Sequence, residues 1–368
     1  MKIKLPVLLF FLFVLMHISA FAQDNFYKRM EGNIGGQAIQ MHVTKEDSEL
    51  NVVYYYQILG LPIKLSGKVE KDGSFILFND DDTGSLKESY TGTFMENYTS
   101  LAGMWSNYDS TVQTTFAVEE TYPTGSSRIN IKTIRNRHYN KNNRLLAEYK
   151  NRQLYIDLPE NASAQRAIND TIIKWQYGIL PRFAGAKPAK PDFERYGRFF
   201  IDSSKAEAEK LEETQGTFMN YGINSSAGVV FNESNIICTE LYNYMYVGGS
   251  QPGKFILYSC FNTQTGKLIT LDDMFKGDYK KALTKQADKV LRIRFDIKKK
   301  NLKKSGFTTK KIALNDNYYL TPQGIIFFYN EADVARYDIG AFPIFISYES
   351  IRSYIREDGI LNWARLLN

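Results

Sequence analysis

The sequence predicts a multidomain α+β protein, in which an N-terminal antiparallel β-meander or small barrel precedes an α+β module with an antiparallel sheet and packed helices. Three observations support this fold class. Between residues 23 and 120, short apolar runs alternate with turn residues at regular spacing, which is typical of all-β domains. After residue 129, segments with helical spacing of apolar residues lie between strand-like runs. Aromatic residues make up 14% of the 368 residues, and they favour β-structure.

The segment 23–120 is expected to form the meander or barrel. Its strand-like runs, separated by turn signals such as Asp72-Gly73, are 38–43, 50–57, 62–69, 74–79, 89–95, 101–106 and 112–118. Short, evenly spaced antiparallel strands of this kind can close into a small barrel. Residues 121–128 hold Pro123, Gly125 and two serines, so we expect a linker there.

An α+β companion module is expected over 129–234. Apolar residues at helical spacing predict a helix over 161–180, which the proline-bounded segment 181–191 should end. A second helix is predicted over 203–213, and a strand over 217–231.

The C-terminal α+β domain is expected over 235–368 and is organised around a hairpin. Alternating side chains predict strands at 239–247 and 254–261, joined by a turn rich in Gly and Pro. A short strand at 267–271 should stop at Asp272-Asp273, which favour a helix N-cap. Beyond it we predict a helix over 278–297, strands over 325–330 and 342–347, and a terminal helix over 348–367.

The two cysteines, Cys238 and Cys260, lie almost symmetrically about the predicted turn. Opposed residues of an antiparallel strand pair come close enough for a disulfide, which an oxidising compartment would allow. The alternative is two buried thiols that pack as small apolar side chains. Alkylation with and without reductant distinguishes them.

Several motifs of the C-terminal half resemble one bacterial domain. They are Tyr-x-Tyr-x-Gly-Gly at 244–249, Thr-Gly-Lys-x-Ile-x-Leu-x-Asp-x-Phe at 265–275, and the runs 324–329 and 342–351. Together they resemble the C-terminal domain of RsiV-type proteins, which also occurs in the peptidoglycan deacetylase PdaC; the resemblance covers about 129–356. This chain departs at the turn, where the family often has Gly-Gly-Ala-His and Ser250 and Gln251 stand here. The resemblance implies an extracellular receptor domain for lysozyme.

Residues 1–22 have the pattern of a cleaved signal peptide. Lys2 and Lys4 precede an apolar run, and Ala20-Phe21-Ala22 forms an A-x-A site. The alternative is a membrane anchor, but His17 and Ser19 shorten the apolar run below the length of a bilayer span. We therefore expect an exported protein, periplasmic or extracellular after cleavage near Ala22, with no transmembrane segment in the mature chain.

Positive charge is concentrated in one segment. Residues 274–311 hold 14 basic and 3 acidic side chains, a local balance of +11, whereas the whole chain carries +6. The apolar stripe of the helix predicted there leaves a basic face of Lys281, Lys285, Lys289 and Arg292. This face could bind an anionic partner, although solvated helix lysines are the commoner situation. Export makes nucleic acid an unfavoured partner.

Motifs for catalysis, metals and cofactors are absent from the sequence. The mature chain has two histidines, His42 and His138, in different predicted domains, and no G-x-S-x-G or H-E-x-x-H pattern. The acidic run 79–84 resembles a calcium loop, but Tyr90 stands where a bidentate Glu would be needed. We expect no catalytic residue, no metal and no cofactor.

The strongest candidate for a binding site is a row of tyrosines, Tyr242, Tyr244 and Tyr246, that leads into Gly248, Gly249, Ser250 and Gln251. Such a row can stack against sugars or anchor a protein; alternatively, this face packs under a helix. We favour a cell-envelope binding protein that recognises a cell-wall glycan or a protein such as a lysozyme-like hydrolase. The alternative is a glycan-acting hydrolase with two carboxylates from Glu240, Asp272, Asp273, Glu331 and Asp333.

Overall fold

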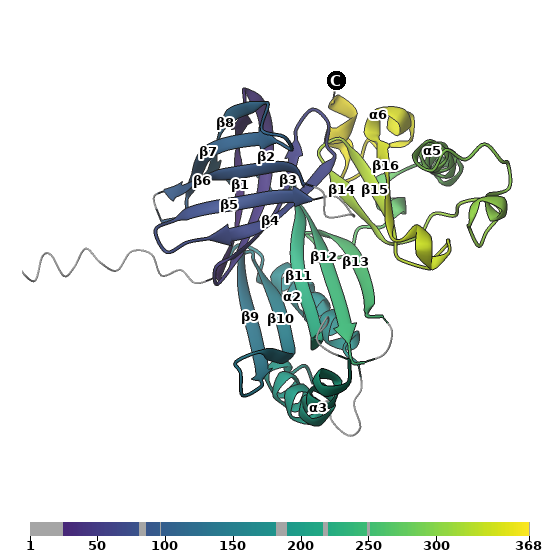
Figure 1. Ribbon diagram of the computed structural model, residues 1–368. Coiled ribbons are helices and arrows are strands. Elements are labelled where there is room, and N and C mark those ends of the chain that lie inside the picture. The colour runs from purple at the N-terminus through teal and green to yellow at the C-terminus, as the bar shows by residue number, and fades with distance from the viewer. Residues whose placement is uncertain are drawn as a thin grey trace, which may run out of the picture.

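The computed structural model describes residues 25–80, 86–95, 97–181, 190–215, 220–248 and 251–367. They form a closed eight-stranded barrel, a five-stranded sheet with two helices, and a C-terminal lobe with a three-stranded sheet. In Figure 1 the barrel and the C-terminal lobe lie to either side of the upper end of the five-stranded sheet. The predicted fold class is confirmed.

Each barrel strand pairs antiparallel with the next, and β1 pairs with β8 to close the barrel. The strands are β1 (Asn25–Ile34), β2 (Gln37–Glu46), β3 (Glu49–Tyr56), β4 (Pro62–Val69), β5 (Ser74–Asp80), β6 (Leu86–Met95), β7 (Ser100–Asn107) and β8 (Gln113–Glu120). Within the barrel, β1 is the one strand for which no run was predicted, since its polar and charged residues interrupt the apolar alternation. Aromatic side chains, among them Phe26, Phe75 and Phe94, fill the interior.

Two barrel glycines lie where neighbouring strands leave no room for a Cβ. At Gly67 in β4 it would overlap the carbonyl oxygen of Ile76 in β5, and at Gly103 in β7 that of Thr91 in β6. We expect Gly67→Ala to lower the free energy of unfolding by about 2 kcal/mol, because the backbone of two strands must move apart. Urea denaturation measures this, and Gly178→Ala, where a Cβ meets open space, is the matched control. Equal stability of the two variants would contradict the explanation.

The five-stranded sheet has the order β13-β12-β11-β10-β9, with β10 and β11 parallel and the other pairs antiparallel. Its strands are β9 (Arg128–Tyr139), β10 (Leu145–Asp157), β11 (Tyr221–Glu233), β12 (Ile236–Tyr246) and β13 (Gly253–Asn262). The predicted hairpin is therefore β12–β13. The sheet runs across the domain boundary expected at 234/235, which falls in the turn between two paired strands.

Helices α2 (Ala162–Gly178) and α3 (Phe193–Gln215) form the crossover between the parallel strands and cover one face of the sheet (Figure 1). The first predicted helix is confirmed. The second is longer than predicted, because it begins at Phe193 rather than at 203. Asp192 accepts a hydrogen bond from the Arg195 backbone N–H at 2.9 Å, and the buried Tyr196 and Phe200 pack against the sheet.

The C-terminal lobe contains α4 (Leu271–Met274), α5 (Tyr279–Arg294), β14 (Tyr318–Thr321), β15 (Gly324–Tyr329), β16 (Phe342–Ser347) and α6 (Tyr348–Ile351). It also has four 3₁₀ turns, η1 (Leu302–Ser305), η2 (Tyr337–Ile339), η3 (Arg352–Tyr354) and η4 (Asn362–Leu366). The helix predicted over 278–297 is confirmed as α5, which buries Leu283, Ala287 and Leu291 of the predicted stripe. Both predicted strands are confirmed as β15 and β16.

Three predictions for this lobe are wrong. The terminal helix over 348–367 is a series of short turns, because Ile355 is extended and forms an isolated bridge with Phe275. The N-cap expected at Asp272-Asp273 is Thr270, and Asp273 completes its capping box from the third helical position. The sequence between the preceding turn and this cap contributes a single bridge, Phe261 to Leu268, rather than a strand.

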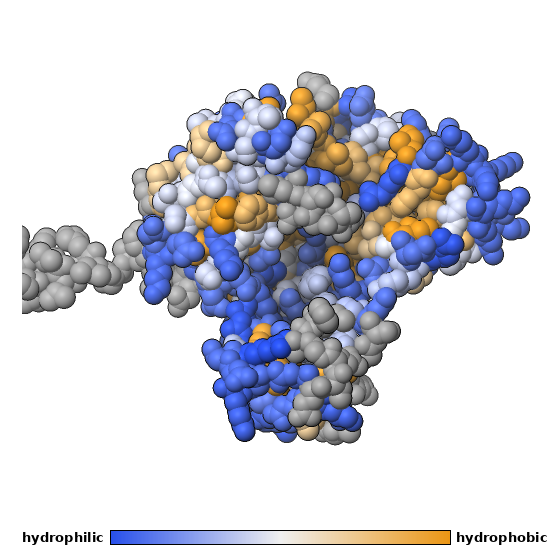
Figure 2. Space-filling model, viewed as in Figure 1, coloured by the Kyte–Doolittle hydropathy of each residue, from blue (hydrophilic) through white to orange (hydrophobic). Residues whose placement is uncertain are grey.

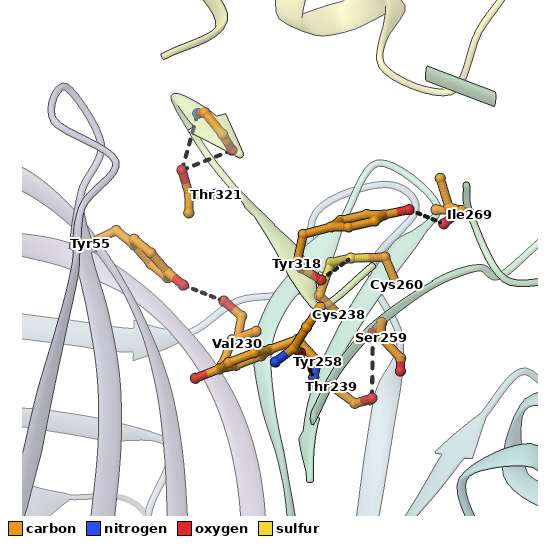
Figure 3. Close-up of a disulfide and its surroundings, with 12 residues drawn as sticks. Tyr55, Val230, Cys238, Thr239, Tyr258, Ser259, Cys260, Ile269, Tyr318 and Thr321 are labelled. Carbon is orange, nitrogen blue, oxygen red and sulfur yellow. Dashed lines mark hydrogen bonds between the residues drawn. A yellow bond between two sulfur atoms is a disulfide. The ribbon is translucent and has the colours of Figure 1, made fainter. Parts of the chain in front are cut away.

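The C-terminal lobe is attached to the edge of the large sheet at β13. Asn330 accepts from the Ile256 N–H at 2.7 Å and donates to its carbonyl at 3.0 Å, and Asn317 bonds the backbone of Ile256 and Tyr258. These amide side chains satisfy the exposed edge of the sheet. Cys238 and Cys260 are opposed in β12 and β13 and joined by a disulfide, with Cα atoms 4.1 Å apart, in the core beneath Tyr318 (Figure 3).

Candidate functional site

The candidate site is the face of the five-stranded sheet that α2 and α3 leave uncovered. Strand register puts Tyr242 beside Ser226 and Ile256, and Tyr244 beside Asn224 and Lys254, on one face. The opposite face carries Ile223, Leu241 and Met245, which pack in the cores beneath the helices. Figure 2 looks onto the uncovered face, where a hollow lies between the barrel and the C-terminal lobe.

The structure separates the predicted tyrosine row into two parts. Tyr242 and Tyr244 are half-buried and present surface on the uncovered face, whereas Tyr246 is buried with 3% exposure. Burial raises the pKa of Tyr242, and the neighbouring Tyr244, Glu240 and Glu331 raise it further, so its hydroxyl stays protonated. Half-exposed aromatic rings with protonated hydroxyls can both stack and donate hydrogen bonds.

The predicted turn residues lie at the lower end of the same strand. Gly248 has φ +90°, a conformation that favours glycine, and Gln251 is exposed. Gly249 and Ser250, which were also predicted site residues, lie outside the described residues. The structure therefore brings Tyr242 and Tyr244 together on one face of the sheet.

A polar cavity of about 270 Å³ lies where the barrel sits on this face. It is lined by strands β2–β5 of the barrel and by β10–β12, including His42, Lys64, Arg152, Gly228 and Glu240. Glu240 Oε2 is 2.5 Å from Lys64 Nζ and accepts from the Tyr258 hydroxyl at 2.5 Å. Burial would raise the pKa of Glu240, but Lys64 and these hydrogen bonds outweigh it and hold the pKa below its ordinary value. Glu240 precedes Tyr242 by two residues, so the cavity residue and the tyrosine lie on the same face of β12.

Buried ion pairs fix the barrel against the sheet beside this cavity. Glu46 of β2 is fully buried, and its Oε2 lies 2.6 Å from Arg152 and 3.3 Å from Lys150. Arg29, also fully buried, bonds Glu31 and Glu233 at 2.7 Å. Sequence reasoning missed these residues. A sequence signal was present. Basic residues alternate along two neighbouring strands, at Arg135 and Arg137 in β9 and at Lys150 and Arg152 in β10, and this alternation places positive charge on one face of the sheet.

The carboxylates considered for a hydrolase are dispersed among structural contacts. Asp272 accepts a hydrogen bond from the Tyr279 hydroxyl, Asp273 caps α4, and Asp333 accepts from the Asn330 backbone N–H. Glu240 belongs to the ion pair with Lys64, and Glu331 lies near Tyr242 in the C-terminal lobe. Asp272, Asp273 and Asp333 therefore serve separate local roles, whereas Glu240 and Glu331 both act on Tyr242.

The two histidines lie far apart in the fold. His42 of β2 is buried against the rings of Tyr27, whose hydroxyl is 2.8 Å from Nδ1, and Tyr55, and burial together with Arg29 lowers its pKa to about 3. His138 Nε2 is 3.0 Å from Glu209 of α3. Across the described part of the chain, no group of three or more His, Cys, Asp or Glu side chains could hold a metal ion. Most of the acidic run 79–84 lies outside the described residues.

One part of the chain matches a known protein family. Residues 272–349 match a family described as "Protein of unknown function (DUF3298)". The chain contains a DUF3298 domain. A DUF3298-family crystal structure from Bacteroides fragilis is 22% identical with a TM-score of 0.51, covering 66% of this chain and 98% of its own. Another from Pseudomonas aeruginosa is 14% identical with a TM-score of 0.45, covering 62% and 95%. No curated protein matches the chain.

The DUF3298 domain comprises α4, α5 and the three-stranded sheet, so it adjoins the uncovered face without containing Tyr242 or Tyr244. The likeness to the Bacteroides fragilis structure shows a shared fold. The resemblance to RsiV-type proteins and to PdaC stays a prediction.

The predicted basic face lies on α5 within the DUF3298 domain. Lys281, Lys285 and Lys289 are exposed, and Arg292 is half-buried beside Asp288, with 2.6 Å between Nε and Oδ2. Within the described ranges, no helix has the length and apolar character needed to cross a bilayer. The predicted signal peptide falls outside the described residues.

Proposed function

We propose that the protein is an exported cell-envelope binding protein that holds a glycan on the uncovered face of the five-stranded sheet. The observation that carries this proposal is the pair of half-exposed tyrosines, Tyr242 and Tyr244, flanked by Asn224 and Lys254 on the same face. Tyrosine rings stack on the CH faces of sugars, and amide, hydroxyl and ammonium groups bond the sugar hydroxyls.

The cavity beneath the barrel would take the end of the glycan. Its volume of about 270 Å³ suits one small polar group rather than a long ligand, so the rest of the ligand would extend over the tyrosines. Lys64, Ser66 and Asn51 line it and offer hydrogen-bond donors.

Binding is favoured over hydrolysis by the state of the carboxylates. A glycosidase needs one carboxylic acid with a raised pKa close to a second carboxylate. The pKa of Glu240, whose charge acts on Tyr242, is lowered by Lys64 and its hydrogen bonds, which favours the ionised form over a proton donor. Burial raises the pKa of Glu88 and of Glu233. Glu88, however, accepts hydrogen bonds from Tyr54 and Trp105, and Glu233 is paired with Arg29, so both carboxyl groups are engaged in structural contacts.

Replacing Tyr244 with alanine is expected to weaken binding of a soluble muropeptide or chitooligosaccharide about tenfold or more. The reason is that one buried aromatic contact contributes about 1–3 kcal/mol to recognition. Isothermal titration calorimetry measures the affinity, and circular dichroism checks that the variant is folded. Tyr108→Ala, at a 67% exposed tyrosine of the barrel, is the matched control and should bind as the parent does.

The resemblance to RsiV-type proteins favours a second candidate, a lysozyme-like hydrolase bound on the same face. A pull-down of purified lysozyme by the parent and by Tyr244→Ala, beside a lysozyme inhibition assay, separates the two candidates. Capture of lysozyme without affinity for the free oligosaccharides would replace the glycan with the protein. A parent that binds neither ligand would disprove both assignments.

A further inference from the structure

A second concave surface lies in the DUF3298 domain, between α5 and the chain that follows it. This groove has a volume of about 600 Å³ and is lined by Lys280, Lys281, Thr284, Lys285, Asp288, Arg292, Lys300, Lys311 and Ile312. Six of its nine lining residues are basic. In Figure 2 hydrophilic residues gather at the edge of the lobe that carries α5 and the segment after it. The proposed glycan face uses none of these residues.

The groove has an ordered wall opposite the helix. Arg292 of α5 donates to the carbonyl oxygens of Lys299 and Lys300 at 2.7 and 3.1 Å, which fixes the loop after the helix against it. Asn301 caps the η1 turn by accepting from the Lys303 N–H at 3.1 Å. The buried Ile312 lines the groove beside Lys311. Positive side chains therefore line both walls rather than one helix face.

The positive charge of the groove is not neutralised from within. Asp288 is the one acidic lining residue, and it is bound by Arg292 through two oxygens, at 2.6 and 3.2 Å. Lys281 approaches Asp278 at 3.9 Å. In the described part of the chain, Lys285, Lys300 and Lys311 form no ion pair with a carboxylate. Several like charges held close together destabilise one another unless an anion joins them.

We propose that this groove binds the phosphate groups of an anionic polysaccharide. Two facing walls of lysines suit a chain of repeating phosphates, because each ammonium group can reach a different anionic oxygen. The alkyl stems of the lysines offer apolar surface to the sugar rings between phosphates. A lipid bilayer presents a flat array of headgroups, which the exposed convex side of α5 would meet more readily than a concave groove.

Binding of an inorganic polyphosphate of defined length to the full mature chain tests the proposal, with neutral dextran as the uncharged probe. We expect Lys285→Gln/Lys311→Gln to weaken polyphosphate binding about tenfold or more. The control Lys289→Gln/Lys298→Gln also removes two positive charges, one from α5 and one from the segment after it. Both residues are exposed and lie outside the groove, so this variant should weaken binding less than about twofold. Isothermal titration at two salt concentrations gives both affinities and the number of ion contacts.

Three results would overturn the proposal. The first is an equal loss of affinity in the two double variants, which would indicate general attraction by net charge. The second is a parent protein that binds no polyphosphate. The third is a parent protein that binds vesicles of anionic phospholipid in preference to polyphosphate. The muropeptide affinity of the groove variant should equal that of the parent, so failure here is distinguishable from failure of the glycan site.

Discussion

Replacing Glu46 with glutamine is expected to lower the free energy of unfolding by about 3 kcal/mol. The carboxylate is fully buried. It forms ion pairs with Arg152 at 2.6 Å and Lys150 at 3.3 Å, and it accepts a hydrogen bond from the Thr133 hydroxyl at 2.8 Å. A neutral amide could still accept a hydrogen bond from Arg152, which also donates to the Ala227 carbonyl, but it would leave this largely buried guanidinium without the negative charge of Glu46. An uncompensated buried charge is costly, whereas the intact pair has well-formed hydrogen bonds.

Urea denaturation of the two proteins at neutral pH measures this difference. Glu49→Gln is the matched control, because Glu49 pairs with the same Lys150 at 2.7 Å but has a side chain that is 44% exposed. A solvated pair contributes less than about 1 kcal/mol, so the control should lose little. Similar losses at Glu46 and Glu49 would show that burial is not the cause.

The same interaction predicts a pH dependence. Burial would raise the pKa of Glu46, but Arg152, Lys150 and the Thr133 hydrogen bond outweigh it, and the pKa lies below the ordinary 4.5. A carboxyl whose folded-state pKa is lowered stabilises the fold fully above its unfolded value and loses that effect as pH falls through the folded value. The stability difference between parent and Glu46→Gln should therefore shrink below about pH 4.5.

Fold class and most elements could be predicted because they depend on local pattern. The helices α2 and α5 have unbroken apolar spacing, and β12–β13 alternates around a Gly/Pro turn. The wrong predictions depend on distant partners. The extended conformation of Ile355 depends on its bridge to Phe275. The early start of α3 depends on the packing of Tyr196 against Tyr149 of β10, on the face of the sheet that the helices cover. No pattern within either segment states which neighbour it will meet.

The candidate site was predicted in part for the same reason. Alternation alone places Tyr242 and Tyr244 on one face, but only the fold shows that Tyr246 is buried and that the helices cover the opposite face. The cavity around Lys64 and Glu240 joins residues 176 positions apart in the sequence, which spacing cannot reveal. The basic groove was visible as a helix face, but its second wall, with Lys300 and Lys311, required the loop geometry that Arg292 fixes.

Removing the disulfide with Cys238→Ala/Cys260→Ala is expected to lower the free energy of unfolding by about 3 kcal/mol. The cysteines are 22 residues apart, and cross-linking a loop of this length restricts the unfolded chain by roughly that amount. The bond lies in the core of the C-terminal lobe, where Cys260 contacts the Tyr318 carbonyl and Tyr318 bonds Ile269 (Figure 3). Urea denaturation of the oxidised parent and of the double variant gives the difference.

The reduced parent separates the cross-link from packing, because it retains both sulfur atoms. If loop restriction is the cause, the reduced parent and the double variant should lose similar stability; a loss confined to the variant would point to the cavity left by the missing sulfurs instead. Alkylation of both thiols in the parent without reductant would contradict the bond itself. Because ten register pairs still join β12 to β13 once the disulfide is gone, Tyr242 and Tyr244 should keep their places below the unfolding transition. Muropeptide affinity of the double variant should then match that of the parent, so the disulfide would secure the strand that carries the site without shaping the site.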